Sequence, residues 1–246
     1  MKSVYTAVAL WLISFNAVAG PNINVGQVYD YLDGDKSTYL KRVFNGGTST
    51  AFVRVKIMEL LLKADGSFKE VALKTQSSNA IREGLMASPA RLIVPANGTQ
   101  GTRLLFMGAR NNERYFRLRF VPVVPEKEDE FGQTEEESEA YKQTLTAGIN
   151  VLAGYGTIFF VRPKNTRFDT QIENTSTHYQ LRNTGNSVIV MDEFKNCDSQ
   201  APLDCEPTTK THVLPGRTHG FKKQPGREYR FTLIEGSSKK SIEVKS

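Results

Sequence analysis

Few residues of this 246-residue chain could carry covalent or metal chemistry, and two of them form a recognisable pair. Cys197 and Cys205 lie eight positions apart in the polar stretch NCDSQAPLDC. In an oxidising compartment this spacing favours a disulfide that closes a small loop. A metal site is the alternative, but the histidines, His178, His212 and His219, have no recognised ligand spacing. We therefore predict a Cys197–Cys205 disulfide and no metal site.

The short motifs of common enzymes are missing from the sequence. It contains no G-x-S-x-G, no H-E-x-x-H and no phosphate-binding glycine loop. Most aspartates and glutamates stand in one acidic run or at turns, so no carboxylate pair has an obvious catalytic setting. The sequence therefore predicts a binding protein rather than an enzyme, with no cofactor.

The first 19 residues have the pattern of a secretory signal peptide. Lys2 provides a positive start, Val4 to Ile13 form an apolar run, and small residues at 17–19 form a cleavage site before Gly20. Export supplies the oxidising compartment that the disulfide prediction requires. No later apolar run approaches the roughly 18 residues of a membrane-spanning helix, so no membrane insertion is expected.

Charge is unevenly distributed along the chain. The formal net charge is +6, but residues 126–139 hold eight acidic side chains and one lysine, a net charge of −7. A basic remainder could suggest nucleic acid, but export makes an acidic protein partner the better interpretation and no nucleic acid is expected. We expect residues 126–139 to form a solvated acidic loop; a short helix from Thr134 to Lys142 is the alternative.

The elements that must position these residues are short strands separated by turns. About seven strands precede residue 162 at a spacing of 8–15 residues, which is typical of an immunoglobulin-like β-sandwich. Shorter strands and Pro-Gly turns follow. The predicted fold class is all-β, with a first immunoglobulin-like β-sandwich domain at residues 20–162 and a smaller C-terminal one at 163–246.

One strand, predicted over residues 145–161, stands out. Its first half alternates, and its second half is nearly all apolar until Arg162 and Pro163 end it. The pattern fits a core strand of an ordinary sandwich. It also fits an edge strand that is kept open so that another chain can pair with it. The apolar residues of the alternating half are Leu145, Ala147, Ile149, Val151 and Ala153.

Several blocks in a fixed order resemble the periplasmic chaperones that assemble fimbriae together with an outer-membrane usher. The blocks are SPARLIVPANGTQGTRLLF at 88–106, RYFRLRFVPVVP at 114–125, a strand ending in VRP, and RNTGNSVIVMDEFKNC at 182–197. The likeness covers the chain after the signal peptide and is greatest to the alternate branch, which serves α-class fimbriae. No single block is specific, but their order and spacing are.

This resemblance implies a fold, a location and a mechanism. It implies two immunoglobulin-like domains in an L shape, in the periplasm of a Gram-negative bacterium. Fimbrial (pilin) subunits and the usher are the implied partners. A subunit is a sandwich that lacks one strand, and the chaperone lends its own strand, here 145–161, to fill the groove. Apolar side chains on one face, Leu145 to Ala153 at every second position, match that role.

Two further roles follow from the resemblance. The classical branch anchors the subunit's terminal carboxylate with two basic residues, but neither residues 22–32 nor 145–161 contain Lys or Arg. Candidate anchors on neighbouring strands are Arg117, then Arg103 and Arg42, each of which could equally belong to a solvated sheet face. At the hinge formed by Arg162 and Pro163, an ion pair between Arg162 and Glu235 is expected.

Two other functions remain as alternatives. The chain could itself be an exported two-domain fimbrial subunit or adhesin, but the donor-like strand then stands in an unexpected place, in mid-chain before a hinge. It could also be an exported sugar-binding protein or hydrolase. That function would need clustered carboxylates or aromatic platforms, and the one tryptophan, Trp11, lies in the signal peptide.

Overall fold

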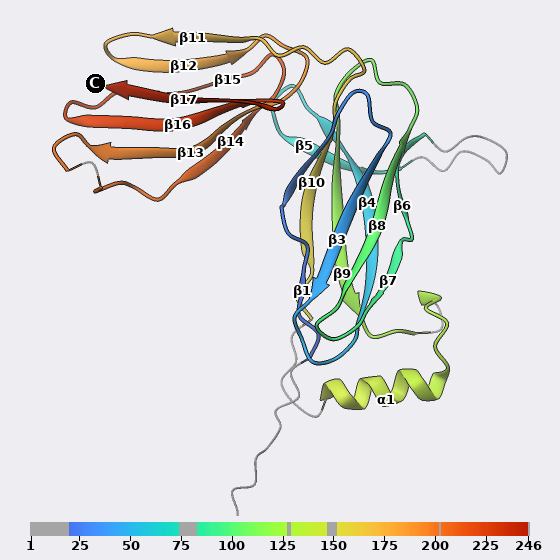
Figure 1. Cartoon of the computed structure of the whole chain (residues 1–246). Coiled ribbons are helices and arrows are strands. Elements are labelled where there is room, and N and C mark those ends of the chain that lie inside the picture. The colour runs from blue at the N-terminus through green and yellow to red at the C-terminus, as the bar shows by residue number, and fades with distance from the viewer. Residues whose placement is uncertain (1–19, 74–82, 127–128, 147–151, 202, 246) are drawn as a thin grey trace, which may run out of the picture.

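The computed structural model describes residues 20–73, 83–126, 129–146, 152–201 and 203–245. Within these ranges the chain is built from short strands and one α-helix. Figure 1 shows two β-sandwiches that meet at a bend beside the end of β10, so that their strands run in different directions and the molecule forms an L. The prediction of an all-β fold with two sandwich domains is confirmed.

The first sandwich consists of two sheets with non-sequential strand order. One sheet has the order β1-β3-β8-β6, and the other has the order β2-β10-β9-β4-β5, with β7 also paired to β4. The strands are β1 (Ile23–Asn24), β2 (Tyr29–Leu32), β3 (Thr38–Asn45), β4 (Ala51–Leu62), β5 (Phe68–Ala72), β6 (Gly84–Ser88), β7 (Arg91–Val94), β8 (Thr99–Met107), β9 (Arg114–Val123) and β10 (Tyr155–Val161).

Alternation along these strands separates a dry core from an outer face. In β9, Phe116, Leu118 and Phe120 are buried in the core, whereas Arg117 and Arg119 lie on the opposite face of the same sheet. Apolar side chains from both sheets form most of this core, and burying them supplies most of the stability. The face carrying the two arginines is called the outer face of the six-stranded sheet below.

The second sandwich is smaller and also has two sheets. Their strand orders are β11-β12-β15 and β14-β13-β16-β17. A separate core lies between them and is rich in aromatic side chains, including Tyr179, Tyr229 and Phe231. The strands are β11 (Thr170–Asn174), β12 (His178–Asn183), β13 (Ile189–Asp198), β14 (Thr209–Val213), β15 (Thr218–Lys222), β16 (Arg227–Glu235) and β17 (Ser238–Lys245).

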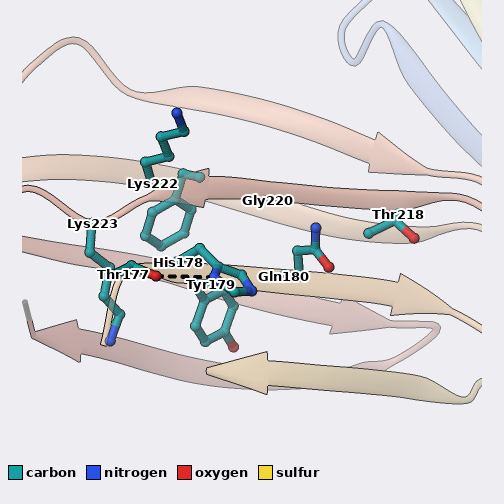
Figure 2. Close-up of a pocket in the computed structure, with 9 residues that line it drawn as sticks. Thr177, His178, Tyr179, Gln180, Thr218, Gly220, Lys222 and Lys223 are labelled. Carbon is teal, nitrogen blue, oxygen red and sulfur yellow. Dashed lines mark hydrogen bonds between the residues drawn. The ribbon is translucent and has the colours of Figure 1, made fainter. Parts of the chain in front are cut away.

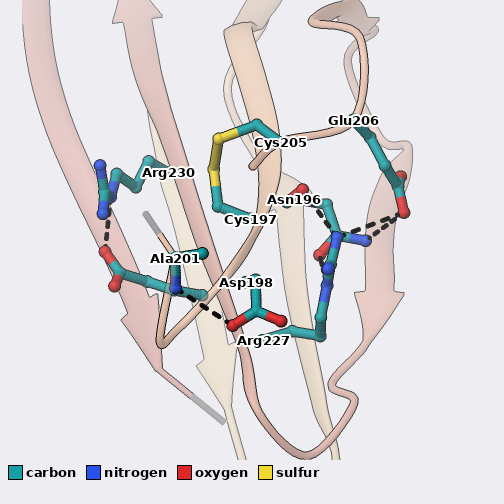
Figure 3. Close-up of a disulfide and its surroundings, with 9 residues drawn as sticks. Asn196, Cys197, Asp198, Ala201, Cys205, Glu206, Arg227 and Arg230 are labelled. Carbon is teal, nitrogen blue, oxygen red and sulfur yellow. Dashed lines mark hydrogen bonds and ion pairs between the residues drawn. A yellow bond between two sulfur atoms is a disulfide. The ribbon is translucent and has the colours of Figure 1, made fainter. Parts of the chain in front are cut away.

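The predicted disulfide is present at the end of β13. The sulfur atoms of Cys197 and Cys205 are 2.03 Å apart, and the two residues also form an isolated β-bridge. Figure 3 shows the loop beside β16, where Arg227 donates to the side chain and the carbonyl of Asn196. Cys197 is fully buried, so the bond ties an otherwise polar loop to the core of the second sandwich.

The acidic run is not a simple loop. Helix α1 (Glu135–Thr146) occupies its second half, so the helix alternative is confirmed and the loop prediction is wrong for these residues. Thr134 and Glu137 form a reciprocal capping box: the Glu137 amide donates to Thr134 Oγ1 at 3.2 Å, and the Thr134 amide donates to Glu137 Oε2 at 2.9 Å. Acidic residues in the first turn further favour the helix N-terminus.

Helix α1 also corrects the prediction for Leu145, which lies in its last turn and not in a strand. The alternation that begins at Leu145 hides a helical pattern, because Tyr141 and Leu145 are four residues apart and share one helix face. Tyr141 donates a hydrogen bond to the Thr50 carbonyl at 2.7 Å and packs edge-on against Phe52. Leu145 is buried, so helical packing prevails over the period-two pattern.

The segment before α1 is held on the outer face as well. Asp129 pairs with Arg54 at 2.5 Å, and Phe131 packs edge-on against Phe52. This end of the sheet is therefore covered by residues 129–146, at the end of the domain remote from the second sandwich (Figure 1). No helix in the described residues has the length and apolar character needed to cross a membrane.

Candidate functional site: the open edge of strand β10

Among the described residues, one edge of strand β10 is unpaired over the first part of the strand. On one side it pairs with β9 throughout, from Tyr155 to Val161. On the other side it pairs in parallel with β2, but only from Ile158 onward. The β10 residues before Ile158 therefore have no strand beside them on that side within the described part of the chain. An edge of this kind can accept a strand from another molecule.

The backbone direction shows which groups face the open edge. The Ile158 amide donates to the Val28 carbonyl at 2.8 Å, so the N–H and C=O of Ile158 point toward β2. Because these groups alternate sides along a strand, those of Gly156 point the same way, where β2 has already ended. Glycine in a strand often marks a place where another backbone approaches closely. Gly156 therefore directs its N–H and C=O toward a side on which no strand of the described residues pairs with it.

Side chains of β10 differ in burial along the strand. Thr157 and Phe159 face the core and are buried, and Ala153 and Tyr155, which precede them at odd positions, are exposed. Of the predicted donor side chains, Ala153 is thus accessible just before the strand. Ala147, Ile149 and Val151 lie outside the described residues, and their role stays a prediction.

Arg117 is the one predicted anchor that lies beside this edge. It stands opposite Ile158 on β9, and a Cβ added to Gly156 would lie 3.8 Å from its Nη1 atom. Its Nε lies 2.8 Å from Oε1 of Glu70, a β5 residue on the far side of β4. The Arg117 guanidinium therefore lies between the Glu70 carboxylate, which its Nε approaches, and Gly156 of β10, toward which its Nη1 extends.

The other two anchor candidates lie elsewhere. Arg42 on β3 and Arg103 on β8 are exposed and belong to the four-stranded sheet, which does not contain β10. A single subunit strand added beside Gly156 would extend the six-stranded sheet and not theirs. The structure brings Arg117 to β10 and leaves Arg42 and Arg103 on the other sheet.

The predicted Arg162–Glu235 ion pair is wrong. Arg162 pairs with Asp33 at 2.6 Å, whereas Glu235 accepts a hydrogen bond from the Thr170 hydroxyl at 2.6 Å. Asp33 directly follows β2, which pairs with the end of β10, and the Arg162 amide donates to the neighbouring Leu32 carbonyl at 3.0 Å. Arg162 still bridges the domains, because its guanidinium lies 5.3 Å from the centre of the Phe168 ring.

Close backbone packing fixes the hinge next to Pro163. A Cβ at Gly34 would lie 2.4 Å from the Pro163 carbonyl oxygen, so no other residue fits there without a shift. Arg110 reinforces the same turn by donating to the carbonyls of Arg162 and Asp33 at 3.0 and 2.9 Å. Burial lowers the pKa of Arg110. The sequence analysis missed Arg110, because no local motif indicates an arginine that donates hydrogen bonds to backbone carbonyls of residues distant in the sequence.

A buried carboxylate links the two sandwiches. Glu113, just before β9, accepts from the Ser187 hydroxyl at 2.6 Å and from the Val188 amide at 2.9 Å. Burial raises the pKa of Glu113, although these hydrogen bonds oppose the shift. Two donors from the second domain thus satisfy a carboxylate of the first, which fixes the register of the interface. Sequence reasoning missed Glu113 as well.

An aromatic cluster completes the domain interface. His212 on β14 lies parallel to Phe160 with 5.2 Å between ring centres, and its Nε2 is 2.7 Å from the Tyr31 hydroxyl. Burial lowers the pKa of His212 to about 4, and nearby Lys210 adds to the shift. His212 is therefore neutral at physiological pH, and the Nε2 of a neutral ring can accept a hydrogen bond from the Tyr31 hydroxyl.

A separate hollow lies on the second sandwich. It has a volume of about 830 Å³ and lies over β12 and β15, where its lining includes Gln180, Gly220 and the lysines Lys222 and Lys223. Figure 2 shows these side chains on neighbouring strands, with His178 hydrogen-bonded within the group. None of its lining residues belongs to β9 or β10. Among the described residues no His, Cys, Asp and Glu cluster could hold a metal ion.

These features define a class of protein before any comparison: a two-domain β-sandwich protein that presents an open strand edge at the inner side of its bend. No family model matches the chain. Two relatives are each named "Probable fimbrial chaperone EcpB". The one from Escherichia coli O1:K1 / APEC is 23% identical over 202 residues, 82% of this chain and 81% of the relative. The one from Escherichia coli O18:K1:H7 (strain IHE3034 / ExPEC) is 24% identical over 200 residues, which are 81% of this chain and 80% of the relative.

Solved structures share the fold. The class 5 fimbriae chaperone CfaA has a TM-score of 0.53 and 16% sequence identity. The periplasmic chaperone SfaE has a TM-score of 0.53 and 10% identity. Each match covers 92% of this chain and 100% of the solved chain. The SafB chaperone, solved with the SafA pilin of Salmonella enterica, has a TM-score of 0.51 and 13% identity, and the match covers 93% of this chain and 97% of the solved chain. The resemblance to fimbrial chaperones predicted from the sequence is confirmed by both comparisons.

Proposed function

We propose that this chain is a periplasmic chaperone that binds fimbrial subunits by lending them a strand and delivers them to an outer-membrane usher. The open edge of β10 carries the proposal, because Gly156 has backbone groups directed away from β9 where β2 has ended. Names of similar proteins support it: the structural neighbours include CsuC in complex with the tip subunit CsuE, at a TM-score of 0.51.

The proposed binding mode combines two kinds of contact. Backbone pairing along Gly156 and the residues before it supplies affinity with little dependence on the subunit's sequence. Apolar side chains on one face, at Ala147, Ile149, Val151 and Ala153, fill the groove that the subunit's missing strand leaves. Leu145 has no part in this contact, because it is buried in α1.

Arg117 is the proposed anchor for a carboxylate of the subunit. It is the anchor candidate whose guanidinium lies next to Gly156. A guanidinium can donate two parallel hydrogen bonds to one carboxylate, which matches this partner better than a lysine does. Arg103 and Arg42 lie on the other sheet, so the proposal gives them no part in the anchor.

The two-domain division at residues 20–162 and 163–246 belongs to the same proposal. The last paired residue of the first sandwich is Val161, and β11 of the second begins at Thr170. Domain contacts through Glu113 and His212 would then hold the bend in which the subunit lies. The rival interpretation as a fimbrial subunit is less well supported, because the open strand stands in mid-chain before the hinge.

The direct test is capture of a purified fimbrial subunit by the mature chain. Arg117→Ala should weaken capture by at least tenfold, because removing one partner of a desolvated charge pair costs about 2–5 kcal/mol. Arg103→Ala and Arg42→Ala are matched controls that should change affinity by less than about twofold. If the parent chain captures no subunit, the chaperone function is refuted; if Arg117→Ala captures as well as the parent, only the anchor is.

A further inference from the structure

Three charged residues form a cluster on the outer face between β5 and β10. Nη2 of Arg119 donates to both carboxylate oxygens of Glu70, at 2.9 and 2.7 Å. Arg117, two residues earlier on β9, approaches the same carboxylate through Nε at 2.8 Å. Two guanidinium groups thus share one carboxylate, and the cluster keeps a net charge of +1.

The two arginines use Glu70 unequally. Arg119 makes two hydrogen bonds to it, whereas the buried Nε–H of Arg117 has no hydrogen bond of acceptable geometry despite its short distance. No hydrogen bond joins the Arg117 guanidinium to any other described residue. Buried donors normally have acceptors, so the donors of Arg117 are incompletely used in the free protein. Its Nη1 lies toward Gly156, at the open edge.

We infer that Arg119 is a positioning residue, which holds Glu70 and thereby keeps Arg117 available to a carboxylate of the bound partner. Without Arg119, Glu70 would have one guanidinium within reach and would form the paired, two-bond contact that arginine and carboxylate prefer. Arg117 would then be neutralised by its own chain. This inference rests on the proposed function, because it assigns a role at the same binding site.

The test is a suppressor experiment with the mature chain and a purified fimbrial subunit. Arg119→Gln should weaken subunit binding by about fivefold, the strength of a partly exposed ion pair, because Glu70 then competes for Arg117. Glu70→Gln in the Arg119→Gln chain should restore most of that loss, because a neutral amide competes poorly. In an Arg117→Gln chain, Arg119→Gln should have no further effect, because the group that it protects is absent.

Two controls separate this mechanism from overall charge. Arg103→Gln removes the same charge from the other sheet, and Glu173→Gln restores net charge in the Arg119→Gln chain at an exposed site of the second domain. The inference predicts little change from the first and no rescue by the second. Equal rescue by Glu70→Gln and Glu173→Gln, or equal loss from Arg119→Gln and Arg103→Gln, would overturn it while leaving the chaperone function intact. Absence of binding by the parent chain would refute the function itself.

Discussion

Replacing Gly156 by proline tests whether the open edge of β10 is the part of the strand that binds. The N–H of Gly156 points away from β9, so proline removes a donor that the free protein does not use in its ladder. The exchange also restricts the unfolded chain, so we expect the free energy of unfolding to change by less than about 1 kcal/mol.

Subunit binding should respond strongly to the same substitution. An added strand would lose the hydrogen bond from Gly156, and its own carbonyl would be left unpaired in the interface, which costs about 1–3 kcal/mol. That cost corresponds to a loss of affinity of about fivefold to 140-fold. Calorimetric titration of the variant with a purified subunit measures it, beside thermal unfolding of the free variant.

Thr157→Pro is the matched control. The N–H of Thr157 points toward β9, so proline there breaks an existing ladder bond inside the sheet and leaves a carbonyl of β9 unpaired, which should lower the free energy of unfolding by about 1–3 kcal/mol. The two variants therefore separate edge pairing from folding. A Gly156→Pro protein that is folded and binds subunit as tightly as the parent would refute the proposed use of this edge.

Three further predictions concern other parts of the chain. Val151→Asp should abolish subunit capture in a pull-down, whereas Asn150→Asp on the opposite face should be tolerated, because only the first places a carboxylate in an apolar groove; equal effects would contradict the parity. The pKa of His212, about 4 in the folded protein against 6.5 unfolded, means that its contribution to stability is complete above pH 6.5 and is lost as the pH falls toward 4. Parent and His212→Gln unfolding curves should therefore diverge by up to about 2 kcal/mol between pH 7 and pH 5, and parallel curves would contradict this. Replacing Cys197 and Cys205 by serine should lower the stability of the second domain by about 2–3 kcal/mol in denaturant unfolding, and an unchanged midpoint would show that the bond is dispensable.

Local sequence patterns predicted much of this architecture. Arginines and apolar residues alternate in the sequence of β9, and this alternation matches the structure, in which Arg117 and Arg119 lie opposite the core residues Phe116 and Leu118. The spacing of the cysteines and the expectation of export predicted their bond, because the two residues close a short loop and have few other partners. Such signals lie within a few residues of one another and depend little on the rest of the fold.

The remaining features depend on contacts between distant residues. The open edge at Gly156 exists because β2 pairs with β10 only from Ile158, and no local pattern states where a neighbouring strand ends. The pairing of Glu113 with Ser187 joins two domains across 74 positions, and Lys41 is buried because it meets Asp30 from another strand at 2.6 Å. A lysine at that position otherwise indicates a solvated face.

Helix α1 shows a different limit. Residues near Leu145 satisfy a strand pattern and a helix pattern at once, and only the capping box at Thr134 and the packing of Tyr141 decide between them. The two glycines Gly154 and Gly156 were a signal that could have located the open edge. Glycine inside an apolar strand weakens it unless another backbone must come close.

Amide hydrogen exchange at Gly156, followed with and without a purified fimbrial subunit, tests the central claim most directly. In the free protein this N–H faces the open edge and should exchange fast, while the Thr157 amide, which faces β9, is protected. Donation of the strand predicts that saturating subunit slows exchange at Gly156 by at least about tenfold and leaves Thr157 nearly unchanged. A subunit that binds tightly while the Gly156 amide exchanges as fast as before would contradict the account.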